Sequence, residues 1–143
     1  MARNAIHAEA TPKKVFAVLS DPASYAEWVV GSREVRAADS HWPAAGSRFH
    51  HTIGLGPLAI KDHTSVERVD PPGRLVLCAK TRPFGIQRIS LQLRKEGRGT
   101  RIVMEEEPVE GPAAWVHNRL FDLLLHARNA EALRRLKRLA ERG

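Results

Sequence analysis

Hydrophobic and polar positions alternate along most of the chain, and the alternation predicts a β-rich fold. Residues 4–10 alternate between apolar and polar side chains, as in a strand with one solvated face. The period is again two from residue 33 to about 107, and turns rich in glycine and proline divide this region. We therefore expect six further strands, over residues 33–39, 47–54, 57–69, 74–82, 86–95 and 99–107.

Three helices are predicted around this β region. Thr11-Pro12 and Asp21-Pro22 each place a side-chain oxygen at a helix N-cap and proline at the first helical position. These signals predict two short helices after the first strand. Residues 113–142 contain no glycine or proline and are rich in Ala, Leu, Arg and Glu, which predicts one long C-terminal helix.

The long helix carries two apolar stripes at helical spacing. The first stripe is Val116, Leu120, Leu123, Ala127 and Ala130, and the second is Phe121, Leu125, Ala132, Leu136 and Leu139. One stripe must pack on the sheet, and the other packs beneath the short helices or forms a subunit contact. A homodimer is therefore one arrangement that the sequence leaves open.

Residues 54–59 read Gly-Leu-Gly-Pro-Leu-Ala, which matches the glycine pattern of a dinucleotide-binding loop. Such a loop needs a helix directly after the glycines, because the helix N-terminus holds the pyrophosphate. The residues after Gly56 alternate with period two instead. The pattern therefore predicts a β-hairpin turn, where glycine permits positive φ and close strand approach, and no bound nucleotide.

Composition is that of one globular domain over residues 1–143, with 43% apolar and 27% charged residues. No apolar run approaches the roughly 18 residues of a membrane span. The N-terminus lacks the apolar block of a signal peptide, and the single cysteine, Cys78, cannot form an internal disulfide. We therefore expect a cytoplasmic protein.

The net charge of +7 raises the question of a nucleic-acid partner. Many of the basic residues lie on the C-terminal helix, where acidic residues are interspersed among them. No aromatic residues interleave with the arginines, as a base-stacking surface would require. The pattern favours a solvated helix face and no nucleic-acid partner. Binding of RNA, an acidic partner or an anionic membrane through this helix is the alternative.

Three ionisable residues share strand positions with apolar neighbours. His51 alternates with Phe49 and Ile53, while Asp62 and Glu106 also have the parity of the covered face of their strands. A buried lone carboxylate is costly unless it is hydrogen-bonded or paired. Each residue is therefore either a satisfied core or rim residue, or one of the polar groups of a pocket.

Other chemistry has little support in the sequence. The seven histidines include no metal-binding spacing, and His50 and His51 point to opposite faces of one strand. No nucleophile elbow or phosphate-binding loop is present. We therefore predict neither a metal site nor a cofactor.

The order of elements and several local motifs resemble the polyketide cyclase/dehydrase and lipid-transport superfamily. This is the START-like or SRPBCC group, which includes the birch-pollen allergen fold. The motifs are Ala10 to Pro22, Tyr25, Trp28, Asp70 to Leu75, Gly99-Thr100, Leu133, Leu136 and Lys137. The resemblance implies an α+β helix-grip fold, in which a curved antiparallel seven-stranded sheet wraps the long C-terminal helix. It implies no particular catalytic residue, since the group has many functions.

In the implied fold, a cavity remains between the sheet and the helix. Trp28 and Trp115 are candidates for its entrance, or are core residues. The expected ligand-binding residues are Trp28, Phe49, His51, Ile60, Asp62, Leu77, Ile89, Leu91, Met104, Trp115, Leu120 and Leu124.

The main functional hypothesis is binding of a small hydrophobic or aromatic ligand, such as a lipid or a polyketide-like compound. His51, Asp62 or Glu106 would orient it. The first alternative is a cyclase or aromatase, for which His51 and Asp62 would supply a base and a proton donor. The second alternative is an interaction protein that uses the basic C-terminal helix.

Overall fold

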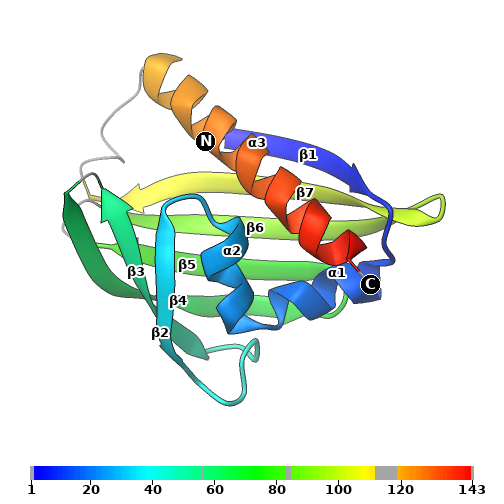
Figure 1. The fold of residues 1–143 in the computed structure, drawn as a ribbon, viewed down its shortest axis with the longest axis horizontal. Helices are drawn as coiled ribbons and strands as arrows, with labels where there is room; N and C mark the ends of the chain where they lie inside the picture. The colour runs from blue at the N-terminus through cyan, green and yellow to red at the C-terminus, as the bar shows by residue number, and fades with distance from the viewer. Residues whose placement is uncertain (1, 56, 83–84, 112–118, 143) are drawn as a thin grey trace.

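A seven-stranded antiparallel sheet curves around one long helix (Figure 1). The computed structural model describes residues 2–55, 57–82, 85–111 and 119–142. The elements in chain order are β1 (Ala2–Ala8), α1 (Pro12–Leu19), the 3₁₀ turn η1 (Pro22–Ser24), α2 (Tyr25–Trp28), β2 (Ser32–Ala38), β3 (Arg48–Leu55), β4 (Leu58–Asp70), β5 (Arg74–Thr81), β6 (Gly85–Glu96), β7 (Gly99–Glu110) and α3 (Arg119–Glu141). This order confirms the predicted α+β helix-grip fold.

The strand order is β1-β7-β6-β5-β4-β3-β2, and every neighbouring pair is antiparallel. Strands β2 to β7 therefore form successive hairpins, and β1 pairs with the last strand. This topology gathers the β3–β4 turn, the β5–β6 turn and the end of β7 at one end of the sheet. The β4–β5 and β6–β7 turns lie at the other end.

The two predicted helix starts are confirmed by their caps. The Thr11 hydroxyl oxygen accepts a hydrogen bond from the Lys14 backbone N–H at 3.2 Å. The Asp21 carboxylate accepts one from the Ala23 backbone N–H at 3.1 Å. Each bond satisfies one of the backbone donors that a helix start leaves unpaired.

The first strand runs over Ala2–Ala8, two residues earlier than predicted. Ala8 is the last residue that pairs with β7, opposite Thr100. The chain then leaves the sheet, and the Thr100 hydroxyl donates to the Ala10 carbonyl oxygen at 2.6 Å. The alternation at Ala10 thus reflects burial beside the sheet and not strand pairing.

The hairpin prediction for residues 54–59 is confirmed, because Leu55 pairs with Leu58. The expected positive φ is wrong for Gly54, which is an extended residue of β3. The Arg33 guanidinium packs against Gly54, in the space that a Cβ would occupy. Gly56 lies outside the described residues.

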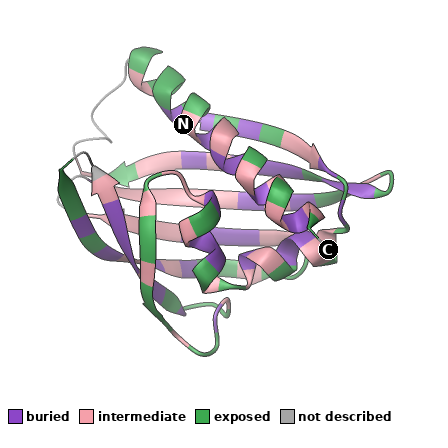
Figure 2. Cartoon of the chain, in the orientation of Figure 1, coloured by how far each residue is buried: buried purple, intermediate pink, exposed green. Residues whose placement is uncertain are grey.

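Helix α3 buries Leu125, Ala132 and Leu136 of the second predicted stripe and exposes Leu120, Leu123 and Ala127 of the first. Its buried residues are Leu125, Asn129, Ala132, Leu133, Leu136 and Ala140 (Figure 2). The predicted helix start at residue 113, with Val116, lies outside the described residues. Among the residues that the structure describes, no helix combines the length and the apolar character needed to cross a bilayer.

Candidate functional site

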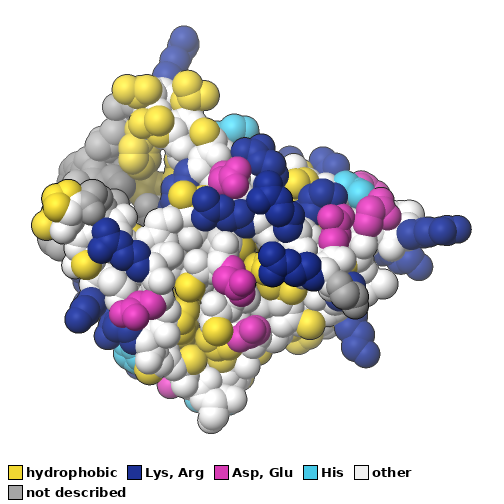
Figure 3. Space-filling view, viewed as in Figure 1, with side chains coloured by type: hydrophobic (Ala, Val, Ile, Leu, Met, Phe, Trp, Pro, Cys, Tyr) yellow, Lys and Arg dark blue, Asp and Glu magenta, His cyan; other side chains and the backbone are white. Residues whose placement is uncertain are grey.

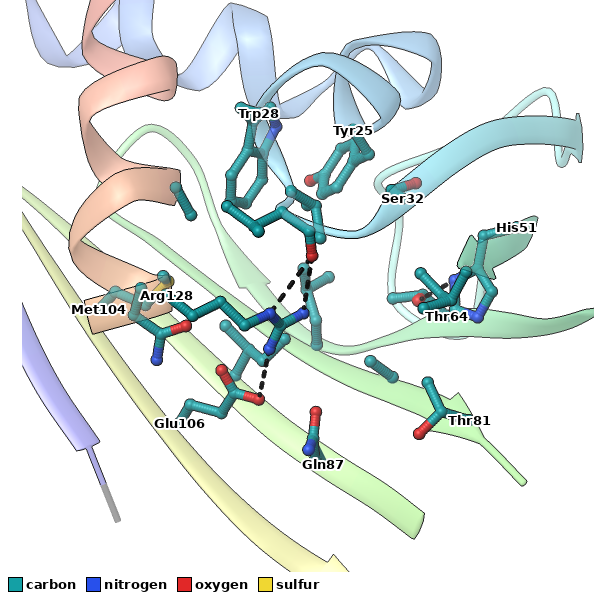
Figure 4. A pocket seen from close by; sticks show the side chains of 18 of the residues that line it. Tyr25, Trp28, Ser32, His51, Thr64, Thr81, Gln87, Met104, Glu106 and Arg128 are labelled. Atoms are coloured by element: carbon teal, nitrogen blue, oxygen red, sulfur yellow. Dashed lines mark hydrogen bonds and ion pairs between the residues drawn. The ribbon is translucent and has the colours of Figure 1, made fainter. Parts of the chain in front are cut away.

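A cavity lies between the concave face of the sheet, α2 and α3 (Figure 4). Its volume is about 70 Å³, which is room for a few water molecules. Its walls are mainly apolar, and a few polar side chains interrupt them. The lining residues are Tyr25, Trp28, Val29, Val30, Ser32, Phe49, His51, Ile53, Thr64, Leu77, Ala79, Thr81, Gln87, Ile89, Met104, Glu106, Arg128, Asn129 and Ala132.

An aromatic cluster forms the wall of the cavity beneath α2. The Tyr25 ring lies 5.0 Å from the Trp28 ring and 4.8 Å from the Phe49 ring, measured between centroids. The Tyr25 hydroxyl donates to the Leu19 carbonyl oxygen at 2.8 Å, and the Trp42 indole donates to the same oxygen at 3.1 Å. Two anchored aromatic side chains therefore hold this wall rigidly.

Glu106 brings a carboxyl group into this apolar surrounding. It lies on β7 opposite Ile89 and is only 1% exposed. Its Oε2 accepts no hydrogen bond from any described residue. Burial raises the pKa of Glu106, and the positive charge of Arg128 opposes this shift only in part. Glu106 therefore holds a proton more readily than an ordinary glutamate does.

Arg128 crosses the cavity from α3 toward the segment that follows α2, as Figure 4 shows. Its Nε and Nη2 donate to the Val30 carbonyl oxygen at 3.3 and 3.2 Å. Its Nη1 lies 3.6 Å from Glu106 Oε2, an ion-pair distance that is too long for a hydrogen bond. The guanidinium thus links three elements and keeps donors directed toward the cavity.

Asn129, the next residue of α3, also faces the cavity and is 2% exposed. Its Nδ2 has no hydrogen-bond acceptor among the described residues. Asn129 lies near enough to Glu106 to lower the pKa of that carboxyl group, but Glu106 Oε2 and Asn129 Nδ2 make no hydrogen bond of ordinary geometry. Buried polar groups without partners are rare in folded proteins, so this pair indicates a place for a polar group of a ligand.

His51 lines the cavity, but both of its ring nitrogens are occupied. Nε2 donates to the Lys80 carbonyl oxygen at 2.9 Å, since a carbonyl can only accept. Nδ1 then accepts from the Thr64 hydroxyl at 3.1 Å. Burial lowers the pKa of His51, which keeps the ring neutral. His51 is fixed in one tautomer as part of the wall.

Asp62 lies opposite His51 on β4, but its carboxylate turns toward Arg82. Arg82 donates to it from its backbone N–H, from Nε and from Nη2 at 2.9–3.1 Å, and the His63 backbone N–H adds a bond at 2.9 Å. Burial alone would raise the pKa of Asp62, but these bonds outweigh it and hold the pKa far below its usual range. Asp62 is therefore a satisfied rim residue.

The remaining predicted residues fall into three groups. Trp28, Phe49, His51, Leu77, Ile89 and Met104 line the cavity, together with Glu106. Ile60, Asp62 and Leu91 are buried but are not among its lining residues. Leu120 and Leu124 are exposed, because the first turns of α3 extend beyond the sheet (Figure 1). Trp115 lies outside the described residues.

The sequence analysis missed Arg128, which it counted among the basic residues of a solvated helix face, and it made no prediction for Asn129. A signal for Asn129 was present. It follows Leu125 by four residues and precedes Ala132 by three, so it occupies the buried stripe of α3 as a polar residue. Arg128 gives no such signal, since its role depends on reaching across the cavity. In the described part of the chain, no cluster of three metal-binding side chains occurs.

The fold is shared with several solved structures. Protein CV1439 from Chromobacterium violaceum has a TM-score of 0.74 at 14% identity, over 99% of this chain and 96% of that one. Protein TTHA0849 from Thermus thermophilus has a TM-score of 0.71 at 17% identity, over 97% and 95%. DynU16, from the dynemicin biosynthetic locus, has a TM-score of 0.68 at 18% identity, over 98% of this chain and 46% of that one.

A search of curated proteins found no match. The family model described as polyketide cyclase/dehydrase and lipid transport matches residues 2–141, almost the whole chain. This match agrees with the helix-grip architecture and with the cavity between sheet and helix. The chain belongs to the polyketide cyclase/dehydrase and lipid transport family.

Proposed function

We propose that this protein binds a small ligand that is largely apolar and carries one hydroxyl or carbonyl group. The apolar part would contact Trp28, Leu77 and Ile89, which lie on three different elements around the cavity. The polar group would lie at Glu106 and Asn129. This mixture of an apolar wall and a few convergent polar groups is typical of small-molecule sites.

The observation that carries the proposal is that the buried Oε2 of Glu106 accepts no hydrogen bond from a described residue, although it lies 3.6 Å from the charged Arg128 Nη1. A buried carboxyl oxygen without a hydrogen bond costs free energy in the folded protein. A ligand hydroxyl would donate to this oxygen and accept from Asn129 Nδ2, which is also unpaired. A ligand carbonyl would accept from Asn129 and from protonated Glu106. Either group would satisfy both protein atoms at once.

The size of the ligand depends on Arg128. The cavity is small, and the Arg128 side chain occupies part of the space between α3 and β7. This side chain is 35% exposed and is held by the Val30 carbonyl and by Glu106. A ligand larger than the present cavity would displace Arg128 toward solvent, at the cost of these contacts.

The test is thermal protection of the protein by a panel of phenols, medium-chain fatty acids and polycyclic aromatic ketones. A ligand at 100 times its dissociation constant stabilises the native state by about 2.7 kcal/mol, so binding is measurable as a rise in Tm. We expect Glu106→Gln to weaken binding at least tenfold. The matched control is Glu105→Gln, because Glu105 is adjacent on β7 and pairs with Arg3 at the surface.

Two results would contradict the proposal. One is that no compound of the panel raises the Tm of the wild-type protein. The other is that a compound protects the wild type, Glu106→Gln and Glu105→Gln equally.

A cyclase-type activity is the second candidate, and the raised pKa of Glu106 favours it. Ring closure and loss of water from a poly-β-ketone need a shaped cavity, a base and a proton donor. His51 and Asp62 have their hydrogen bonds occupied, which leaves Glu106 for proton transfer. DynU16, a relative in fold, comes from the dynemicin biosynthetic locus. If Glu106→Gln leaves the product distribution from a poly-β-ketone unchanged, this role is excluded.

A further inference from the structure

The exposed large apolar side chains gather at one end of the molecule. Within the described ranges these residues are Leu58, Val109, Leu120, Leu123 and Leu124, which are 41–67% exposed. We call them the apolar end. They come from three separate segments: the β3–β4 turn, the end of β7 and the first two turns of α3. Single exposed apolar residues are ordinary, but a concentration of this kind marks an interaction surface.

The register of the fold places these three segments at the same end. Leu58 begins β4 at the β3–β4 turn, and Val109 lies close to the end of β7. Asn4 near the start of β1 donates to the His126 carbonyl oxygen, so the α3 residues before His126 lie at this end too. Figure 3 shows the resulting apolar surface over the beginning of α3 and, separately, over the adjoining corner of the molecule.

The opposite end of the molecule is polar. Its β4–β5 and β6–β7 turns expose charged residues such as Asp70 and Arg98. The last turns of α3 lie there as well, because Lys137 Nζ donates to the His7 carbonyl oxygen near the end of β1. The exposure of leucines is therefore a property of one end and not of the whole surface.

The apolar end adjoins the cavity. Leu120, Leu124 and Arg128 follow one another at intervals of four residues, so they lie along one side of α3. The row leads from the exposed leucines to the guanidinium that crosses the cavity. On the sheet side, Ile53 of the lining lies two residues before the end of β3.

We propose that the apolar end docks on the surface of an anionic lipid bilayer, with its leucines inserted among the lipids. Charge complementarity supports this partner. The chain carries a net charge of +7, which attracts it to an anionic surface as a whole. At the apolar end, exposed Arg33, Lys61 and Arg119 lie among exposed Glu34, Glu110 and Asp122. Arg82 at this end is paired with Asp62, so the attraction comes from the charge of the whole chain, and the basic side chains of this end supply contacts for lipid headgroups.

The shape of the apolar end also fits a bilayer. Its residues belong to a turn, a strand end and a helix end, and Figure 3 shows the apolar surface there as separate patches. A bilayer interface accommodates separate apolar side chains beside basic ones, as it does for peripheral helices. This docking does not depend on which ligand the cavity holds, and it goes beyond the proposed ligand binding.

The test is flotation of the purified protein with vesicles of phosphatidylcholine alone and of phosphatidylcholine with 30% phosphatidylserine, a fraction on the order of that in anionic leaflets. The main variant replaces Leu120, Leu123 and Leu124 by glutamine, which removes the apolar side chains without changing the charge. The control variant replaces Arg134 and Arg138 by glutamine. These exposed residues lie on α3 toward its other end, so the control removes charge but no apolar contact.

We expect the wild-type protein to bind the anionic vesicles and to bind them less at high salt. The leucine variant should bind at least tenfold more weakly, whereas the arginine variant should stay within about threefold of the wild type. Circular dichroism melts of both variants verify folding.

Three results would overturn the proposal. The wild type could fail to bind either kind of vesicle, or the leucine variant could bind as well as the wild type. The third is that sedimentation shows a wild-type dimer that the leucine variant converts to monomer, with no vesicle binding by either. That result would assign the apolar end to a second copy of the chain.

Discussion

The two halves of the space beneath α3 are built from the same strands but differ in what fills them. The packed half lies toward the β4–β5 and β6–β7 turns, and the hollow half lies toward the apolar end. Along each strand, the inward side chains change from large and apolar in the packed half to short or polar in the hollow half. From the packed half to the hollow half, the side chains that point toward the helix are, on each strand in turn, Leu75, Leu77, Ala79 and Thr81 on β5, Leu91, Ile89 and Gln87 on β6, and Ile102, Met104 and Glu106 on β7.

This gradient explains where the cavity lies. Leu75, Leu91, Ile102 and Leu136 are completely buried and fill the packed half with hydrocarbon. Ala79 and Thr81 leave space in the hollow half because their side chains are short, and Glu106 keeps polarity there. The packed half therefore supplies the larger part of the hydrophobic stability, at roughly 25 cal/mol for each Å² buried. The hollow half has less packing and contains the cavity.

The largest expected effect comes from shortening one leucine in each half. Leu75 and Leu77 lie two residues apart on the same face of β5, and only Leu77 lines the cavity. We expect Leu75→Ala to lower the free energy of unfolding by about 4 kcal/mol and Leu77→Ala by about 2 kcal/mol. The reason is that Leu77 already lacks neighbours on its cavity side. Urea unfolding measures both values, and equal losses would contradict a hollow half.

A smaller loss of stability is expected when the hydrogen-bonded carboxylate of Asp62 is neutralised. Asp62→Asn removes the charge that accepts bonds from Arg82 and His63, and we expect a loss of about 2 kcal/mol at neutral pH. Because the native pKa of Asp62 lies below its usual value, this contribution is present above pH 4 and is lost as the pH falls. The control Asp70→Asn alters only an exposed pair with Arg68, so its loss should stay within about 0.5 kcal/mol. A similar loss in both variants would refute the assigned role.

The smallest effect has the opposite sign and concerns Glu106. Its pKa is raised in the folded state, so its contribution to stability is complete below its ordinary pKa of 4.5 and is lost as the pH rises through the folded value. Glu106→Gln avoids this loss, and we expect it to raise the free energy of unfolding at pH 7 by about 1 kcal/mol. Unfolding measured from pH 4 to pH 8 should show the gain growing with pH. A gain that does not change with pH would mean that Glu106 has an ordinary pKa.

Much of the fold could be predicted from the sequence, because its signals are local. Period-two alternation located the strands of the β region, and Thr11 and Asp21 marked helix starts that the observed caps confirm. Parity also placed His51, Asp62 and Glu106 on the covered face, and all three are buried. Strand ends were less certain, as β1 shows, because pairing stops where the chain turns toward the next element.

The sequence alone determined which side chains of the strands face the interior, since alternation fixes their direction from their own segment, but it left open which stripe of the long helix packs inward. Only the tertiary structure decided what those side chains do there. Asp62 receives three hydrogen bonds from Arg82, twenty residues away, whereas Glu106 Oε2 lies 3.6 Å from Arg128 across the cavity and accepts no hydrogen bond from a described residue. The physical reason is that satisfaction of a buried polar group depends on partners from other elements, and these become neighbours only when the sheet closes around the helix.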